Sequence, residues 1–130
     1  MAVGFLTNFT VDNVSGYAVG VLTADGTPSA CSIFCGFKPR VARSTQISGT
    51  VGNGAVTTAD SSMTAAYMTQ QVAGGTSTIP TSNGFTFLDG SEASPAAKAT
   101  GSPLSAGPGI TLGTAVQATA SAAYRIELWR

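Results

Sequence analysis

The sequence contains no histidine. This absence excludes Ser-His-Asp and Cys-His nucleophile systems, histidine metal ligands and a histidine pH switch. Among the motifs of common enzymes we find neither a P-loop nor a dinucleotide-binding fingerprint nor a nucleophile elbow. We therefore expect no catalytic residues and no cofactor.

Cysteine is also scarce, with only Cys31 and Cys35 in the chain. On an extended strand, residues four apart have Cα atoms about 13 Å apart, which is too far for a disulfide. Two cysteines without a histidine do not complete a zinc site. We expect two buried free thiols and no bound metal, in agreement with synthesis in a reducing compartment.

Charge is the third scarce quantity. Six basic and six acidic residues make up 9% of the chain and leave no net charge. A neutral chain lacks the basic footprint of nucleic-acid-binding proteins, so no nucleic-acid partner is expected. Because like charge keeps small proteins apart, neutrality favours a protein packed against copies of itself or a partner. A monomer covered by serine and threonine hydroxyls is the alternative.

Long apolar runs are absent as well, since no stretch approaches the 18 residues of a membrane-spanning helix. The first residues have no basic segment before a long apolar core, so we predict neither a secretory signal nor a membrane partner. The length of 130 residues fits a single domain over 1–130.

What the chain does contain is alanine, threonine, glycine and serine, which together form just over half of it. Apolar residues alternate with small or polar ones, which predicts half-buried strands near residues 3–12 and 17–21. Their alternating apolar positions are Val3, Phe5, Phe9 and Val11, with Leu6 as the exception, and Tyr17, Val19 and Val21. Asn13 to Gly16 predicts a turn between them, and Asp25-Gly26 is typical of a hairpin turn.

Further strands are predicted along the chain. Residues 30–37 place Cys31, Ile33, Cys35 and Phe37 on one face, and residues 41–51 place Val41, Ile47 and Val51 on another. Turns or loops follow at 52–54 and 74–84, a short strand at 85–88, and a long aperiodic loop at 89–109. The last segments alternate at Ile110, Leu112, Val116 and Ala118, and place Tyr124, Ile126 and Leu128 opposite Arg125, Glu127 and Trp129.

Only residues 63–72 fit a helix, with Met63, Ala66, Tyr67 and Gln70 at helical spacing. A strand with Met63, Ala65 and Tyr67 on one face is the alternative, and it is favoured because the rest of the chain is β. About eight short strands predict an all-β fold, an antiparallel β-sandwich of jelly-roll-like form with long Gly/Ser/Pro-rich loops. A small barrel is the other possibility.

The acidic group Asp89-Gly90-Ser91-Glu92 opens the long loop. Two carboxylates three residues apart could hold a cation or serve acid–base chemistry. A solvated turn is the commoner use of such a sequence, so we expect one here.

Two segments are candidates for a protein interface. Lys38, Arg40 and Arg43 hold three of the six cations within six residues, where they could meet an acidic subunit. At the other end Trp129, the single tryptophan, precedes Arg130. A terminus that keeps strand alternation to its end is typical of one tied down, and Trp and Arg are enriched at interface centres. Packing of Trp129 in the core is the alternative.

The charge-poor composition and the segment from Gly16 to Thr27, GYAVGVLTADGT, resemble small virion proteins of tailed bacteriophages, in particular capsid decoration (cement) proteins. The resemblance implies a β-rich protein, made in the host cytoplasm, that binds the outer capsid surface of the virion. Its partners would be the major capsid protein and copies of itself, with a trimer favoured. A tail, fibre or baseplate component that binds a host receptor or glycan is the alternative, and a small enzyme using Asp89 and Glu92 is a third.

Overall fold

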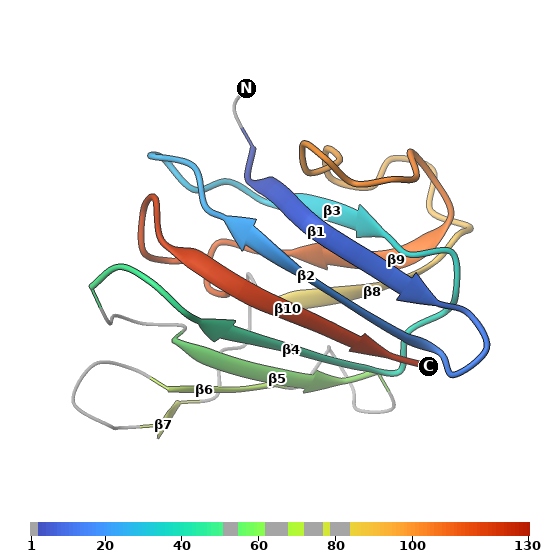
Figure 1. Ribbon diagram of the computed structural model, residues 1–130, viewed down its shortest axis with the longest axis horizontal. Helices are drawn as coiled ribbons and strands as arrows, with labels where there is room; N and C mark the ends of the chain where they lie inside the picture. The colour runs from blue at the N-terminus through green and yellow to red at the C-terminus, as the bar shows by residue number, and fades with distance from the viewer. Residues whose placement is uncertain (1–2, 51–54, 62–67, 72–76, 79–83) are drawn as a thin grey trace.

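In the computed structural model the described residues form an antiparallel β-sandwich of ten strands (Figure 1). It describes residues 3–50, 55–61, 68–71, 77–78 and 84–130, and among these residues no helix occurs. No helix long and apolar enough to cross a membrane is found in that part of the chain. The all-β sandwich expected from the alternation is confirmed, and its jelly-roll form stays a prediction.

Seven strands form a large sheet and three form a small one. The large sheet has the order β1-β2-β10-β4-β5-β6-β7, and the small sheet has the order β3-β9-β8. The strands are β1 Phe5–Asp12, β2 Tyr17–Thr23, β3 Cys31–Phe34, β4 Val41–Gln46, β5 Val56–Asp60, β6 Met68–Gln71, β7 Ser77–Thr78, β8 Phe85–Asp89, β9 Pro108–Leu112 and β10 Ala123–Trp129.

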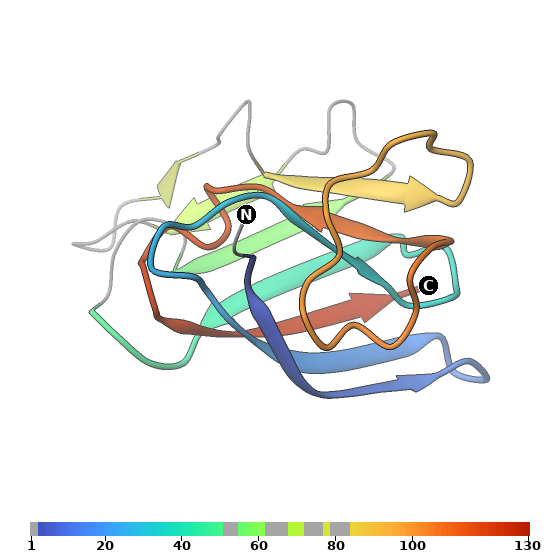
Figure 2. The ribbon, with the colours of Figure 1, turned by 90° about the horizontal axis from the view of Figure 1, so that it is seen from above.

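The last strand lies inside the large sheet rather than at its edge. β10 pairs with β2 on one side and with β4 on the other. Its inner residues Tyr124, Ile126 and Leu128 are fully buried. The small sheet covers this inner face, and the two layers are seen from another side in Figure 2. The C-terminal strand is therefore anchored, as its alternation predicts.

The core lies between the two sheets. It combines aliphatic and aromatic side chains of both layers; its largest fully buried members include Leu22, Ile33, Phe85, Ile110, Leu112 and Tyr124. Cys31 and Cys35 are buried and free, as expected, and burial raises the pKa of both thiols.

The long loop between β8 and β9 is held at its centre. The Ser32 amide donates to Ala97 O (2.7 Å) and the Ala99 amide donates to Ser32 O (2.8 Å), which joins the loop to β3. The Leu6 amide then donates to Thr100 O (2.7 Å) on the opposite side. The segment 97–100 therefore links an edge of the small sheet to β1, at the edge of the large one (Figure 2).

Glycine is required where this segment leaves β1. Gly101 has a φ of +92°, and a Cβ there would collide with the Leu6 carbonyl. The predicted aperiodic loop thus closes one side of the sandwich.

The prediction of which residues face the core is wrong for the first residues of β1. Phe5 is 50% exposed and Leu6 is buried, the reverse of the odd-position pattern. The pairing with β2 shifts between Thr7 and Thr10, and Asn8 has a φ of +53°. This bulge turns the strand by one position, so Leu6 and Phe9 both lie on the inner side.

Other expectations are corrected at turns and strand ends. Asp25-Gly26 does not form a hairpin, because it connects β2 of the large sheet to β3 of the small one. β4 ends at Gln46, its buried residues are Ala42 and Ser44, and Ile47 beyond it is 51% exposed. After β9, Val116 is buried but Ala118 is exposed.

The alternative between helix and strand is decided for part of 63–72. Residues 68–71 form β6, which pairs with β5, so the strand is confirmed there. Residues 63–67 and 72 lie outside the described residues. So do the turn at 52–54, Val51, and the loop 74–84 apart from β7 and Gly84.

A candidate protein-interaction surface

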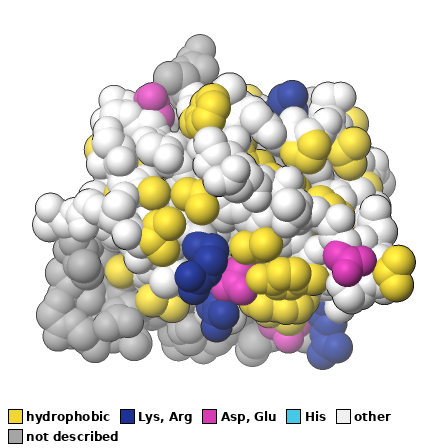
Figure 3. Space-filling model, viewed as in Figure 1, with side chains coloured by type: hydrophobic (Ala, Val, Ile, Leu, Met, Phe, Trp, Pro, Cys, Tyr) yellow, Lys and Arg dark blue, Asp and Glu magenta, His cyan; other side chains and the backbone are white. Residues whose placement is uncertain are grey.

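The outer face of the large sheet, opposite the core, carries large apolar and charged side chains together. On β2 the residues that point outward are Tyr17, Val19 and Val21, all half-buried. The register places Trp129 beside Tyr17, Glu127 beside Val19 and Arg125 beside Val21. On the other side of β10, Arg43 lies opposite Glu127. Figure 3 shows basic and acidic side chains of this face side by side, bordered by hydrophobic ones.

Glu127 is the centre of this surface. Its carboxylate accepts hydrogen bonds from Tyr17 Oη (2.8 Å) and from Arg43 Nη2 (2.9 Å) and Nε (3.2 Å). Arg125 Nε lies 3.5 Å away and forms a second ion pair. One carboxylate therefore fixes three side chains from three neighbouring strands.

The environment shifts two pKa values in opposite directions. Burial by itself would raise the pKa of Glu127, but the hydrogen bonds from Tyr17 and Arg43 and the charges of both arginines outweigh it and lower the pKa. Burial raises the pKa of Tyr17, and its hydrogen bond to Glu127 raises it further. At neutral pH the surface thus holds an ionised carboxylate and a neutral phenol.

Aromatic contacts complete the arrangement. The rings of Tyr17 and Trp129 have centroids 5.5 Å apart and are tilted by 47°. The Arg43 guanidinium lies 5.6 Å from the centre of the Trp129 ring, a cation–π distance. We call Tyr17, Arg43, Arg125, Glu127 and Trp129 the outer-face cluster.

The structure brings together two of the residues predicted from sequence, Arg43 and Trp129. Arg40 lies next to them: its amide donates to Trp129 O (2.7 Å), and its side chain is 3.9 Å from Asp60. The core alternative for Trp129 is wrong, because its side chain points away from the core.

Arg130 and Lys38 have other positions. The Arg130 guanidinium donates to Asn13 O (3.0 Å) and Val14 O (3.2 Å), so it ties the C-terminus to the β1–β2 turn. The Lys38 side chain lies apart from the outer-face cluster, in the pocket beside the end of β8. The three cations at 38–43 therefore do not act as one basic group.

Sequence reasoning did not select Tyr17, Arg125 or Glu127 as site residues. Each lies on a strand whose alternation is visible in the sequence. Their proximity, however, depends on the pairing of β2, β10 and β4. Tyr17 and Glu127 are 110 positions apart in the chain. The opposite charges of Glu127 and Arg125, and the hydrogen-bonding capacity of Tyr17, become a signal only once the strand order is known.

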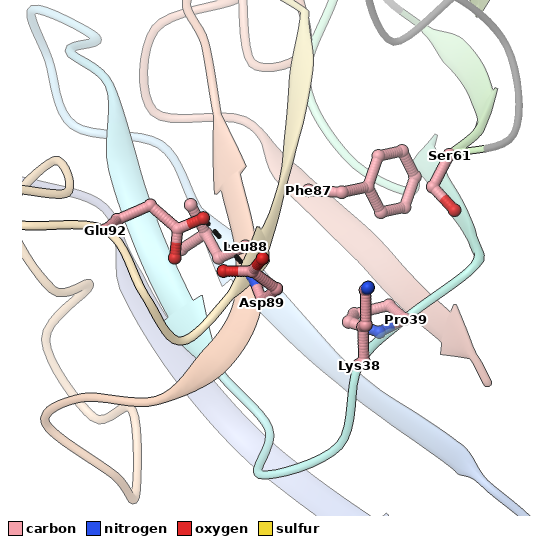
Figure 4. A pocket seen from close by; sticks show the side chains of 7 residues that line it. All are labelled: Lys38, Pro39, Ser61, Phe87, Leu88, Asp89 and Glu92. Atoms are coloured by element: carbon pink, nitrogen blue, oxygen red, sulfur yellow. Dashed lines mark hydrogen bonds between the residues drawn. The ribbon is translucent and has the colours of Figure 1, made fainter.

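The predicted acidic group lines a small pocket of about 280 Å³ (Figure 4). Lys38, Phe87, Asp89 and Glu92 lie around it. The Glu92 carboxylate accepts the amides of Asp89 (3.2 Å) and Gly90 (3.0 Å). Asp89 Oδ1 accepts the hydroxyl (2.6 Å) and amide (2.9 Å) of Ser91, and these bonds lower its pKa. Both carboxylates thus stabilise the turn itself, as the solvated-turn interpretation predicts.

In the described part of the chain, no group of three His, Cys, Asp or Glu side chains could hold a metal ion. Comparison with protein-family models, with curated protein sequences and with solved structures gives no match. Among the described residues, the outer-face cluster is the arrangement that best fits a binding role.

Proposed function

We propose that this chain is a structural virion protein that binds the outer surface of a capsid and stabilises the shell by bridging major capsid subunits. It would act through contact area and repeated copies, with a homotrimer favoured. It would need neither a cofactor nor nucleic acid nor a membrane. The neutral, charge-poor composition supports a protein that works at high local density.

The single observation that carries the proposal is the outer-face cluster. Tryptophan, tyrosine and arginine are the residues most enriched at binding hot spots. Here they lie on central strands of a sheet. Tyr17 and Arg43 are held in place by hydrogen bonds to Glu127, and the Trp129 ring packs against both of them. A surface fixed before binding loses little side-chain freedom when a partner docks, which favours affinity.

The test starts from the genes on either side of the gene for this chain: if one encodes a major capsid protein, shells are assembled from that protein. We expect saturable binding in sedimentation with the shells and a higher shell disruption temperature when the chain is bound. Light scattering after size exclusion measures the oligomeric state, expected to be a trimer. Absence of binding to expanded and unexpanded shells would overturn the proposal.

A second function, host receptor or glycan binding by a tail, fibre or baseplate component, is favoured by one feature. The Tyr17–Trp129 pair lies beside hydrogen-bonding groups, as in sites where a sugar ring stacks on an aromatic side chain. A glycan array separates the two functions, because glycan binding without shell binding supports only the second.

A further inference from the structure

The outer-face cluster has an uneven charge distribution at its surface. The Glu127 side chain is only 10% exposed, whereas the side chains of Arg43 and Arg125 are 44% and 46% exposed. A docking partner therefore meets two guanidinium groups, while the carboxylate between them lies beneath. Arg125 is held less tightly, because its nitrogen lies 3.5 Å from the Glu127 carboxylate, against 2.9 Å for Arg43. Each guanidinium group has five N–H donors.

Apolar side chains adjoin these cations. Val21 lies directly opposite Arg125 on β2, and Val19 lies opposite Glu127. Both valines are half-buried, so part of each side chain remains open to a partner. The surface thus offers a cationic group and an apolar strip on adjacent strands.

The edge of the large sheet at β1 is less suited to a partner than the outer face is. The segment 97–100 already bonds to Leu6, and the bulge at Asn8 interrupts the regular ladder that an added strand needs. The outer face has neither obstacle.

We propose that the occupant of the outer face is a protein subunit that presents a carboxylate next to an apolar side chain. The carboxylate would bind the exposed N–H groups of Arg125 and Arg43, and the apolar side chain would cover Val19 and Val21. This inference rests on the proposed function and names the chemistry of the capsid surface that is bound. Nucleic acid fits less well, because phosphate chains require many cations, and Lys38 and Lys98 lie on other parts of the molecule.

The experiment compares three chains on the same capsid shells: unsubstituted, Arg125→Gln and Lys98→Gln. Each variant loses one positive charge from an exposed side chain, but only Arg125 belongs to the outer face. We expect Arg125→Gln to weaken binding about tenfold and to reduce its salt dependence, and Lys98→Gln to bind normally. A Val21→Thr variant, which keeps the shape of the side chain, tests the apolar strip against Val14→Thr in the exposed turn. Thermal unfolding checks that every variant folds.

The outcomes are distinct. If the unsubstituted chain binds the shells and Arg125→Gln binds equally well, this inference is overturned while the proposed function stands. If the unsubstituted chain does not bind, the proposed function fails and the inference fails with it. If Arg125→Gln instead disrupts self-association in the absence of shells, the occupant is a second copy and the assignment to an acidic capsid surface is wrong. Restored binding of Arg125→Glu to a shell in which one surface Asp or Glu is replaced by Lys would identify the partner carboxylate.

Discussion

The two faces of the large sheet differ in a way that seven residues of β2 already show. The inner face carries Ala18, Gly20 and Leu22, and the outer face carries Tyr17, Val19 and Val21. Except for Leu22, the inner residues are thus smaller than the outer ones, although the inner face is the fully buried one. The size of apolar residues does not decide which face of a strand packs in the core.

The inner side chains of β2 can be small because side chains of β1 fill the space beside them. Phe9 comes over Gly20 after the bulge in β1, and Leu6 lies opposite Leu22. On the outer face the described residues add no second sheet, so large side chains remain half-buried against one another. The inner face therefore determines folding, and we assign binding to the outer face. Four experiments test this division, from the largest expected effect to the smallest.

Deletion of residues 128–130 should have the largest effect. It removes Leu128 from the core, together with the bonds from the Arg40 amide to Trp129 O and from the Arg130 amide to Gly16 O. We expect a loss of about 4 kcal/mol or more of unfolding free energy, measured by urea denaturation. Deletion of Arg130 alone, which leaves the core intact, should cost about 1 kcal/mol. Equal stability of both truncated chains would contradict an anchoring role for the end of β10.

Adjacent residues on opposite faces give the second comparison. Leu22 is fully buried, so Leu22→Ala should cost about 2–5 kcal/mol through lost burial and the cavity left behind. Val21 is half-buried, and Val21→Ala should cost about 1 kcal/mol or less. Urea denaturation of the two variants measures the difference. If the two costs were the same, the outer face would have to be as tightly packed as the core.

This division explains how much of the fold could be predicted. Alternation is a local property, so it located most strands, including 85–88 and the two faces of 123–129. It failed at Phe5 and Leu6 because the bulge at Asn8 depends on pairing with β2, which no local pattern shows. The loop 89–109 shows no periodicity in the sequence because the residues to which it hydrogen-bonds, Ser32 and Leu6, are far away along the chain.

The candidate site was predictable only in part for the same reason. Arg43 and Trp129 were chosen for their residue types, and both lie on the outer face. Glu127, the common partner of Arg43 and Tyr17, is 84 positions from Arg43 in the chain and 110 from Tyr17. Only the order β2-β10-β4 brings these residues together, and the sequence does not reveal that order.

Gly20 provides the third test, because Phe9 packs directly against it on the inner face. A Cβ at Gly20 would lie 2.7 Å from Phe9 Cδ1 and 3.0 Å from Phe9 Cα, and the latter belongs to the backbone of the bulge. Gly20→Ala should therefore destabilise the fold by about 1–3 kcal/mol in thermal or urea unfolding. Gly26→Ala is the matched control, since no atom lies within 4 Å of the added Cβ. A neutral Gly20→Ala would mean that Phe9 can move away without loss.

The smallest effect concerns Glu127 and depends on pH. Glu127→Gln keeps the shape of the side chain but removes the charge that binds Arg43 and Arg125, so it should cost about 1–2 kcal/mol at neutral pH. The pKa of Glu127 is lower in the folded chain than its ordinary value of 4.5. Its contribution is therefore complete above that value and is lost as the pH falls through the folded pKa.

Unfolding free energies of both proteins, measured from neutral to acidic pH, should therefore converge as the pH falls below about 4.5. The lowered pKa values of Asp12 and Asp89 affect both proteins equally, so the difference between the two curves isolates Glu127. A difference that stays constant with pH would show that the charge of Glu127 does not stabilise the cluster. Convergence would show that an ion-pair network around Glu127 organises the outer face.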